Sequence, residues 1–538
     1  MKPIFKPHSV HQQALFPLNL NDLVAENHSA RLIDSVVEQL EIPDIISQYK
    51  GGGTSSYPPK MLLKILFYGY LNNTFSCRKL AKAIEENIYF MWLSGGLRPD
   101  FRTINNFRSQ KLKGHIDKLF SQLVLLMVDL DLVTLEKQFI DGTKIEANAH
   151  KYSFVWKKSV EKNQAKLKSK INEVLTDISN AIVADNQAID APSEVDINSQ
   201  KLKEKIKEIN ENTKIDSLTK QQAKSLKKLQ NEQLPKLAEY EQHLDVLKDR
   251  NSYSKIDTDA TFMRMKEDHM GNGQLKAGYN VQLSTESQFI THYSIHQKPT
   301  DTTTLIPHLA SFKEAYQKES KQIIADAGYG SEENYQSLEN KEVEFFIPYN
   351  TYRQEQKRAF KKDIFHTQNL YYNAGQDYLV CPMGQHMERI YTYKRQTSTG
   401  YEQNIAVYQA KNCHDCPLRG LCHKSNENRK VEINHNLQRL KMKAKGFLQS
   451  QTGQQLYPQR CIEPEPVFGN LKQNKKFKRF TLTSLPKVAI EFGLMAIAHN
   501  LAKWHARAVL SDFFQIYAQV KEVLKPKNNM RLNKMTLT

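Results

Sequence analysis

The chain has 538 residues, which is long for one domain and suits about two to four. It carries 76 Lys and Arg against 58 Asp and Glu, and the net charge of +18 favours a polyanionic partner, nucleic acid first, over a merely basic soluble protein. No apolar run reaches the roughly 18 residues of a membrane span, the N-terminus lacks a signal-peptide pattern, and six Cys are too few for a disulfide scaffold. We therefore expect a protein of a reducing cytoplasm.

The N-terminal part predicts a set of short helices. Apolar residues recur at helical spacing over residues 27–40, 60–71, 77–88 and 116–131. A further helix over 101–111 follows the N-cap Asp100, and Arg102, Asn105 and Lys111 lie on its outward face. Arg and Asn suit the reading of base edges, and short helices with tight turns are typical of helix-turn-helix proteins, although an ordinary bundle with a solvated face has the same pattern. We expect residues 1–131 to form a helical DNA-binding domain.

Residues 132–156 and the segment that follows differ sharply in composition. Residues 138–141 and 145–147 predict two strands joined by a turn at Gly142-Thr143. Residues 157–250 are rich in Lys, Glu, Gln and Asn, and their apolar residues alternate at spacings of three and four. This heptad pattern predicts two long antiparallel helices, inserted after the first strands and interrupted near Pro235.

The next elements suggest a fold class. A β-hairpin over 277–296 turns at Glu286-Ser287, a helix covers 302–316, and a buried strand ends on Asp326. Gly-Tyr-Gly-Ser331 then caps a short helix from Glu332, and a strand covers 343–348. Without the helical insertion, the order of strands and helices from Asp141 is that of an RNase H-like domain. We expect a mixed α+β and α/β protein whose RNase H-like domain comprises residues 132–156, 251–349 and 457–507.

Residues 350–456 predict a second insertion with four cysteines. Cys413-His-Asp-Cys416 has the spacing that lets two thiolates reach one Zn²⁺, Cys381-Pro-Met-Gly resembles a knuckle turn, and Cys422 would complete a Cys₄ site. His414 or His423 can replace one cysteine, and four free thiols are the alternative. A closed four-ligand site would be structural, because it leaves no position for a substrate.

The C-terminal part begins with a third acidic residue of interest, Glu465. A basic cluster that includes Lys472, Lys475 and Lys476 follows, and we expect it to contact DNA. An apolar helix is predicted over 485–507, and residues 508–538 form a basic, polar tail.

Three acids in such a domain have a definite chemistry. Asp141, Asp326 and Glu465 would bind two Mg²⁺ (or Mn²⁺) about 4 Å apart, because hard divalent cations prefer carboxylate oxygens. One ion would activate a water or a DNA 3′-hydroxyl and the other would stabilise the leaving oxygen in an in-line displacement at phosphorus. Asp257 and Asp259 are interpreted as loop residues.

The segments around the three acids resemble the signatures of a known family. They are similar to those of bacterial insertion-sequence DDE transposases and read Phe-Ile-Asp141-Gly-Thr, Ile-Ile-Ala-Asp326-Ala-Gly-Tyr-Gly-Ser and Glu465-Pro-Val-Phe-Gly-Asn-Leu-Lys472. The resemblance implies an enzyme that binds the inverted repeats of an element through its N-terminal domain, cuts at the element ends and joins the freed 3′-hydroxyls to target DNA. It covers most of the chain, and the two insertions fit it least.

One subgroup of this family places Tyr, Arg, Glu and Lys in series, as Tyr457, Arg460, Glu465 and Lys472 do here. By this resemblance Tyr457, Arg460 and Lys472 hold phosphates of the cleaved end. Four residues separate Arg460 from Glu465 instead of the usual three, so Glu463 and Glu491 remain rivals for the third acid. The Pro-Val-Phe-Gly context and the spacing to Lys472 favour Glu465.

Two other functions share these residues. An RNase H-like nuclease would cleave DNA without joining it, and a domesticated DNA-binding protein would do neither, although all three acids are present. The resemblance implies double-stranded DNA as the partner, a homodimer on DNA because paired ends are cut together, and association with the nucleoid.

Overall fold

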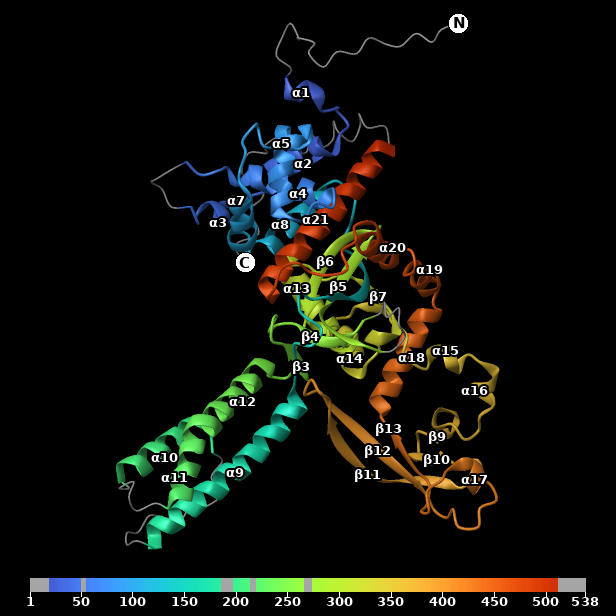
Figure 1. Cartoon of the computed structure of the whole chain (residues 1–538). Coiled ribbons are helices and arrows are strands. Elements are labelled where there is room, and N and C mark those ends of the chain that lie inside the picture. Colours follow the sequence, from blue (N-terminus) through green and yellow to red (C-terminus); the bar gives the residue numbers. More distant parts are fainter. Residues whose placement is uncertain (1–18, 50–54, 185–196, 213–218, 266–272, 511–538) are drawn as a thin grey trace, which may run out of the picture.

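The computed structural model describes residues 19–49, 55–184, 197–212, 219–265 and 273–510. A central sheet lies in the middle of the molecule, a group of short helices lies at one end, and two separate arms extend from the other end (Figure 1). One arm is helical and contains α9 to α12, and the other is a second sheet that contains β9 to β13. The structure is therefore mixed α and β, as expected.

The N-terminal helices form largely where their apolar spacing predicts them. Their bounds are α1 Leu20–Leu23, α2 Ser29–Gln39, α3 Pro43–Ile46, α4 Pro59–Leu71, α5 Cys77–Glu86, α6 Ile88–Leu93, α7 Phe101–Asn106 and α8 Ile116–Asp129. A π-helical turn, Phe107–Lys111, continues α7. The predicted helix over 77–88 ends early, because the Asn87 side chain accepts hydrogen bonds from the backbone N–H groups of Tyr89 and Phe90 and so begins α6.

The central sheet has six strands in the order β4-β5-β1-β7-β8, with β6 also paired to β5. The strands are β1 Lys137–Glu146, β4 Thr261–Arg264, β5 Leu275–Glu286, β6 Phe289–His296, β7 Gln322–Ala325 and β8 Glu344–Phe346. β1 is central and runs antiparallel to β5 and parallel to β7, and β7 runs parallel to β8. The β5–β6 hairpin turns at Ser287 and Gln288, which both have positive φ as a two-residue hairpin of type I′ requires.

The predicted turn at Gly142-Thr143 is wrong. Residues 139–146 form one uninterrupted strand in which Gly142 pairs with Gln282 and Thr143 pairs with Val281 of β5. Glycine is required here for close approach and not for a turn, because a Cβ on Gly142 would lie 2.5 Å from Gln282 Nε2 and 2.7 Å from Asp301 Oδ1.

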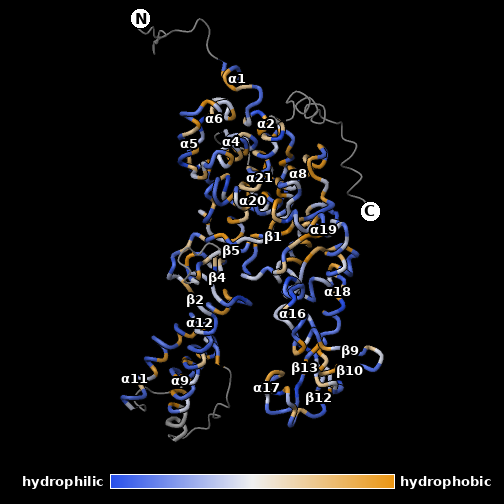
Figure 2. The backbone as a smooth tube through the Cα atoms, turned by 90° about the vertical axis from the view of Figure 1, so that its right-hand side faces the viewer, coloured by the Kyte–Doolittle hydropathy of each residue, from blue (hydrophilic) through white to orange (hydrophobic). Residues whose placement is uncertain are grey.

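One long helix, α21 Leu485–Leu510, joins the N-terminal helices to the sheet. It packs against α2, α4, α8 and β6, and its Trp504 is among the largest buried side chains. Apolar residues of the N-terminal helices, of β5 and of α21 belong to one continuous hydrophobic core. The orange stretches of Figure 2 gather in this upper part of the molecule, whereas the arms are mostly blue. The N-terminal helices are therefore held rigidly against the central sheet.

Gly493 allows α21 to pack closely, and we expect Gly493→Ala to lower the free energy of unfolding by about 1–3 kcal/mol. Its Cβ would lie 2.4 Å from Ile116 Cγ1 and 2.5 Å from the Tyr293 hydroxyl oxygen. The control is Gly446→Ala in α18, His435–Gln449, where a Cβ meets open space. That change should stabilise by about 0.5–1 kcal/mol. Denaturant unfolding measures both, and equal effects would contradict the packing argument.

The remaining helices pack on both faces of β1, β7 and β8. Ile140, Ile323 and Phe345 pack with α13 Leu305–Tyr316, α14 Glu332–Asn340 and α18. Phe139, Ile324 and Phe346, which point to the opposite face, pack with the end of α18 and with α19 Gln451–Gln459. The short segment α20, Pro464–Gly469, packs on β1 and β5. The expected insertion at 350–456 includes the residues of α18, yet α18 packs against α14 and β8 and so belongs with the central sheet.

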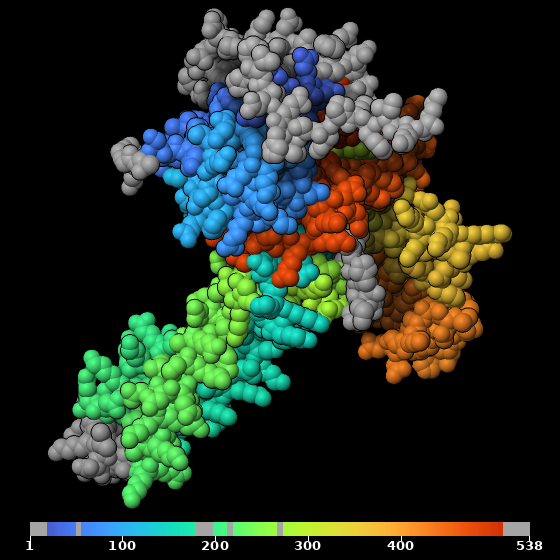
Figure 3. Space-filling model, turned by 45° about the horizontal axis from the view of Figure 1, so that its top comes forward, coloured from blue at the N-terminus to red at the C-terminus, as the bar shows by residue number. Residues whose placement is uncertain are grey.

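The helical arm differs from the predicted pair of long helices. Its outward leg is α9, Lys157–Ala184, and its return leg is α11 Lys220–Lys228, the π-helical turn Leu229–Gln233 and α12 Leu234–Leu247, with Pro235 in the first turn of α12. A further helix, α10 Ser199–Asn212, packs beside them. The strands β2 Phe154–Trp156 and β3 Ser252–Ser254 pair at the base of this arm. Figure 3 shows the arm projecting from the body.

The second arm is a sheet in the order β13-β12-β11-β10-β9. Its elements are α15 Tyr352–Glu355, α16 Arg358–Lys362, β9 Tyr371–Asn373, β10 Tyr378–Val380, β11 His386–Gln396, β12 Glu402–Ala410, α17 Arg419–Cys422 and β13 Lys430–Ile433. The predicted tail begins too early, since α21 continues to Leu510, and the rest of the tail lies outside the described residues. No helix in the described ranges is long and apolar enough to cross a membrane.

Candidate active site and nucleic-acid interface

Two of the three acids lie on neighbouring strands of the central sheet. Asp141 lies within β1, and Asp326 directly follows β7. Ile140 pairs with Ala325 in the parallel β1–β7 ladder, so the acids that follow these two residues are neighbours. Asp141 is 6% exposed and accepts a hydrogen bond from Gly142 N–H (2.8 Å), whereas Asp326 is partly exposed and accepts one from Gly328 N–H (2.8 Å).

Arg460, at the end of α19, brings the third acid into this group. Its Nη2 lies 3.7 Å from Oε1 of Glu465, which is in the first turn of α20. Burial lowers the pKa of Arg460, but the charges of Asp141, Asp326 and Glu465, with a contribution from Tyr457, outweigh it and raise the pKa above its usual value. The guanidinium therefore lies within electrostatic range of all three carboxylates.

The rival acids have other partners. Glu463 accepts a hydrogen bond from Gln288 N–H (2.7 Å) in the β5–β6 turn, and burial raises the pKa of its carboxyl. Glu491 is fully buried in α21 and accepts hydrogen bonds from Thr481 and Leu482. Neither is among the charges that raise the pKa of Arg460 most.

Asp257 and Asp259 lie in the loop between β3 and β4, as the sequence predicts, and both have defined partners. Asp257 is buried and accepts hydrogen bonds from the Tyr279 hydroxyl (2.9 Å) and Ser484 N–H (3.0 Å), and Asp259 accepts one from Leu485 N–H (2.8 Å). They anchor the start of α21 to β5.

A fourth acid, Asp301, was missed in the sequence. Its Oδ1 accepts hydrogen bonds from Asn280 Nδ2 (2.8 Å) and Gln282 Nε2 (3.0 Å), next to Gly142. The buried Tyr329 hydroxyl donates to Gln282 Oε1. Burial raises the pKa of Tyr329 well above its ordinary value, and the charges of Asp301, Asp141 and Asp326 raise it further. Asp301 follows no strand and belongs to no recognisable motif, so only the fold reveals it.

Mg²⁺ and Mn²⁺ prefer carboxylate ligands in proteins. The three carboxylates near the Arg460 guanidinium are therefore a chemically suitable ligand set for a divalent metal ion. In the residues that the structure describes, however, no three Asp, Glu, His or Cys side chains are gathered into a cluster that could hold a metal ion as they stand. The three acids therefore have the right ligand chemistry for the metal, and the Arg460 guanidinium is the positive charge that faces them here.

The basic residues predicted to contact DNA are placed differently from one another. Tyr457 is partly buried and packs beside Leu456 on the sheet, Lys472 lies in the π-helical turn Asn470–Asn474, and Lys476 is exposed. Lys475, by contrast, points inward, and its Nζ donates to the backbone carbonyl of Leu71 (3.0 Å). Burial lowers the pKa of Lys475 to about 8.

This buried lysine predicts a pH-dependent stability. Between pH 8 and about 10.4 the unfolded chain keeps the Lys475 proton that the folded chain has released, so the free energy of unfolding rises with pH across this window. Below pH 8 both states are protonated, and the contribution of Lys475 stays at its lowest value. The free energy of unfolding of the unmodified protein should rise by about 1–3 kcal/mol relative to Lys475→Met across this window. Urea unfolding of both proteins at several pH values measures it. A difference independent of pH would contradict the inward placement.

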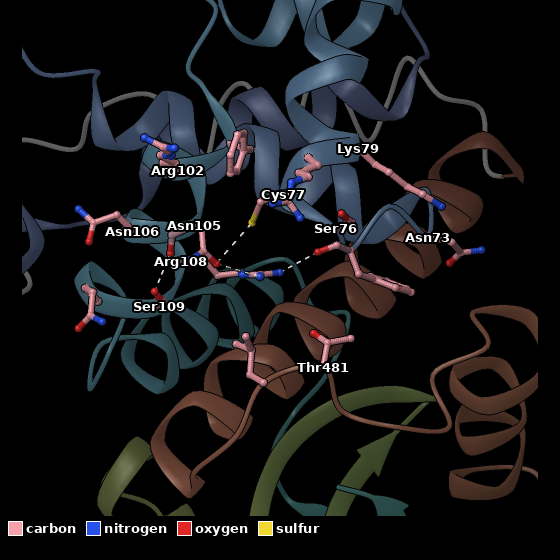
Figure 4. Close-up of a pocket in the computed structure, with 15 residues that line it drawn as sticks. Asn73, Ser76, Cys77, Lys79, Arg102, Asn105, Asn106, Arg108, Ser109 and Thr481 are labelled. Atoms are coloured by element: carbon pink, nitrogen blue, oxygen red, sulfur yellow. Dashed lines mark hydrogen bonds between the residues drawn. The ribbon is translucent and has the colours of Figure 1, made fainter. Parts of the chain in front are cut away.

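A polar cleft of about 760 Å³ lies among the N-terminal helices (Figure 4). Side chains of α5 and of α7 line it on two sides, together with Thr481 and Leu482 from the segment before α21. Its cationic residues are Arg78, Lys79, Arg102 and Arg108, and its lining contains no Asp or Glu.

Buried hydrogen bonds fix the wall of the cleft. The Arg108 guanidinium donates to the Phe75 carbonyl (2.7 Å) and to Asn105 Oδ1 (3.3 Å), which ties α5 to α7. Arg78 and Arg102 both lie over the Phe101 ring, at 4.9 and 5.7 Å from its centroid, with their guanidinium groups exposed. Arg102 and Asn105 thus line the cleft as their outward spacing predicts.

Lys111 is placed elsewhere. Its Nζ donates to the Gln48 carbonyl (2.7 Å) and lies 4.7 Å from the centre of the Tyr49 ring. This contact holds the end of the α7 segment against the residues after α3, outside the lining of the cleft.

Comparison with known families now adds to this geometry. A model described as a transposase DDE domain matches residues 380–505, and one described as a transposase domain (DUF772) matches residues 18–110. Both matches support an insertion-sequence DDE transposase. The first match contains Glu465 and the second contains most of the cleft, whereas Asp141 and Asp326 lie outside both. Comparison of the chain with curated proteins and with solved structures gives no match.

Proposed function

We propose that this transposase binds the terminal inverted repeats of its element, cleaves DNA at the element ends and transfers the 3′-hydroxyl ends to target DNA. The observation that carries the proposal is the convergence of Asp141, Asp326 and Glu465 on the Arg460 guanidinium. The strand order, with a central β1 antiparallel to β5 and parallel to β7, supports an RNase H-like catalytic domain built from residues 132–156, 251–349 and 457–507.

Asp141, Asp326 and Glu465 would hold divalent metal, two Mg²⁺ in our proposal. When bound, the ions supply activation of the attacking oxygen and charge stabilisation at the leaving oxygen. Arg460, with Tyr457 and Lys472, would bind the phosphates of the DNA end, and the guanidinium suits bidentate phosphate contact. Asp301, Gln282 and Tyr329 would hold the backbone around Gly142, and so keep Asp141 in place.

The N-terminal domain, residues 1–131, would bind the inverted repeats through the cleft. Four cations and no carboxylate in its lining favour a phosphate backbone, and Asn105 and Asn106 add groups that can hydrogen-bond to base edges. Lys111 and Lys475 have intramolecular partners, and we assign them structural roles. The insertions at 157–250 and 350–456 would extend the surface that faces DNA or a partner copy. We place the activity in the cytoplasm, on the nucleoid.

The test is strand cleavage of a labelled duplex that carries the element's own end, in Mg²⁺ and in EDTA. We expect metal-dependent cleavage at the element boundary, and joining of the new 3′-hydroxyl when target DNA is added. Cleavage without joining would indicate the nuclease. Tight binding without cleavage in Mg²⁺ or Mn²⁺ would indicate an inactive DNA-binding protein. The mass of the complex should correspond to a dimer on DNA, and a single chain would remove that part of the proposal.

A further inference from the structure

The four cysteines of the second arm come together at one edge of its sheet. Cys381 directly follows β10, and Cys413 lies shortly after β12. β10 and β12 both pair antiparallel with β11, so they run in the same direction and end at the same edge. Only β11 separates them, and strands that flank a common neighbour lie roughly 10 Å apart. Short turns after each strand are therefore enough to bring the thiols together.

Both strands end in tight turns that direct a sulfur inward. After β10, Cys381 N–H donates to the Gln385 carbonyl and Gly384 N–H donates to the Cys381 carbonyl, both at 2.9 Å, with Gly384 at φ +80°. After β12, Asp415 adopts φ +55° between Cys413 and Cys416. The left-handed residue in each turn folds the chain back around the cysteine, as in metal-binding knuckles.

All four thiols are free and line one small cavity together with His423 and Arg429. The cavity has a volume of about 20 Å³, which is enough for one water-sized particle. Two N–H donors point at its sulfurs: Arg429 N–H lies 3.3 Å from Cys413 Sγ, and Arg429 Nη1 lies 3.0 Å from Cys422 Sγ. N–H donors of this kind also surround the sulfurs of structural metal sites, where they hydrogen-bond to the ligands.

His423 adds an independent observation. Both of its ring nitrogens are shielded from solvent, and neither has a hydrogen-bond partner among the described residues. A buried imidazole without partners loses the hydrogen bonds it would make in water, so His423 is the alternative to Cys422 as the fourth ligand of a metal in this cavity.

We propose that this cavity binds one structural Zn²⁺ through Cys381, Cys413, Cys416 and Cys422. As noted above, the described side chains do not already form a closed ligand cluster, so the thiols must rotate toward the cavity centre on binding. Arg429 then neutralises part of the negative charge of four thiolates, and its Nη2 bond to the Phe365 carbonyl (2.6 Å) ties the site to the segment before β9.

The arm has a physical need for such a site. Its hydrophobic core consists of few residues, with Leu379, Met387 and Tyr408 as its largest side chains, and it projects away from the body of the molecule (Figure 1). Small units with so little apolar burial are commonly stabilised by a metal or by disulfides. Zinc at this edge would link β10, β12 and α17, and the closed ligand set excludes a catalytic role.

The first test uses the full-length unmodified protein, purified without chelator, and measures zinc by mass spectrometry and by release to a zinc-sensitive dye during thiol titration with a mercurial. We expect about one zinc per chain, released as four thiols react. A protein that carries no zinc, and that retains none after incubation with Zn²⁺ and gel filtration, overturns the proposal. This readout needs no variant and no DNA, so it is independent of the proposed function.

The second test assigns the ligands. The double variant Cys413→Ser/Cys416→Ser should lose at least about ten-fold of the bound zinc, whereas Cys461→Ser, which changes an exposed thiol away from the cavity, should keep it. Unchanged zinc in the double variant overturns the site. In the Co²⁺-loaded protein, Cys422→Ser should weaken the sulfur-to-cobalt absorption and His423→Ala should leave it unchanged. The reverse result would overturn Cys422 as the fourth ligand.

Discussion

Strand cleavage at the element end is expected to slow by about 10²- to 10³-fold when Glu465 is replaced by Gln. The substitution keeps the size of the side chain and removes the charge that lies 3.7 Å from the Arg460 guanidinium. With Asp141 and Asp326 unchanged, the site keeps its two strand acids and loses the one on α20. The loss should appear in the rate at saturating DNA and saturating Mg²⁺, measured with the labelled end duplex.

Glu463→Gln is the matched control, because Glu463 lies two residues earlier in the chain. Its carboxylate accepts a hydrogen bond from Gln288 N–H, and the amide oxygen of Gln can accept the same bond. We expect cleavage within about two-fold of the unmodified rate. Full activity of Glu465→Gln together with loss in Glu463→Gln would exchange the roles of the two residues. Asp141→Asn should be at least as severe as Glu465→Gln, since Asp141 is the most buried of the three acids.

Much of the central sheet is predictable from the sequence, because its strands are short apolar runs that end on a polar residue. The strand before Asp326 and the helix after Ser331 form where the pattern predicts them. The prediction failed at Gly142, where glycine signals a turn by propensity, but here lets Gln282 and Asp301 approach a continuous strand. Local propensity does not distinguish these two uses of glycine.

The sequence also does not predict whether a charged side chain points into the protein or into solvent. Lys475 and Lys476 are adjacent in a basic cluster, yet one is buried against the carbonyls of α4 and the other is exposed. Glu463 and Glu465 follow Arg460 by three and five residues, and only the fold shows that Glu465 lies beside its guanidinium whereas Glu463 accepts a hydrogen bond from Gln288 N–H. Asp301 lies near Gly142 because it follows β6, and β6 and β1 both pair with β5. No local sequence pattern predicts this proximity.

The same core couples the cleft to the acids. Thr481 and Leu482 line the cleft and are held by Glu491 of α21, and α21 packs on both the N-terminal helices and β6. A duplex fixed in the cleft would therefore have a defined position relative to the central sheet. If the cleft binds the element end, this packing would hold the site of cleavage at a fixed separation from it along the DNA.

Replacing Arg78, Lys79 and Arg102 together by Gln is expected to weaken binding of the end duplex by about 10²- to 10³-fold near 0.1 M salt. Each of these exposed cations lines the cleft, and each phosphate contact adds about 0.9 to the slope of log affinity against log salt concentration. The slope should therefore become less steep by about 2 to 3. Fluorescence anisotropy at several salt concentrations measures both quantities.

The matched control removes the same number of charges from the same domain. Lys60, Lys82 and Lys118 are outside the cleft, and each is paired with an acid: Glu38 at 3.3 Å, Glu86 at 3.4 Å and Asp44 at 2.7 Å. Their joint replacement by Gln lowers the net charge by the same amount. Any loss of DNA affinity that both triple variants show therefore results from weaker long-range electrostatic attraction alone. An equal loss of affinity and of salt slope in both triple variants would mean that the cleft does not contact the phosphates, and that DNA binds elsewhere on the protein.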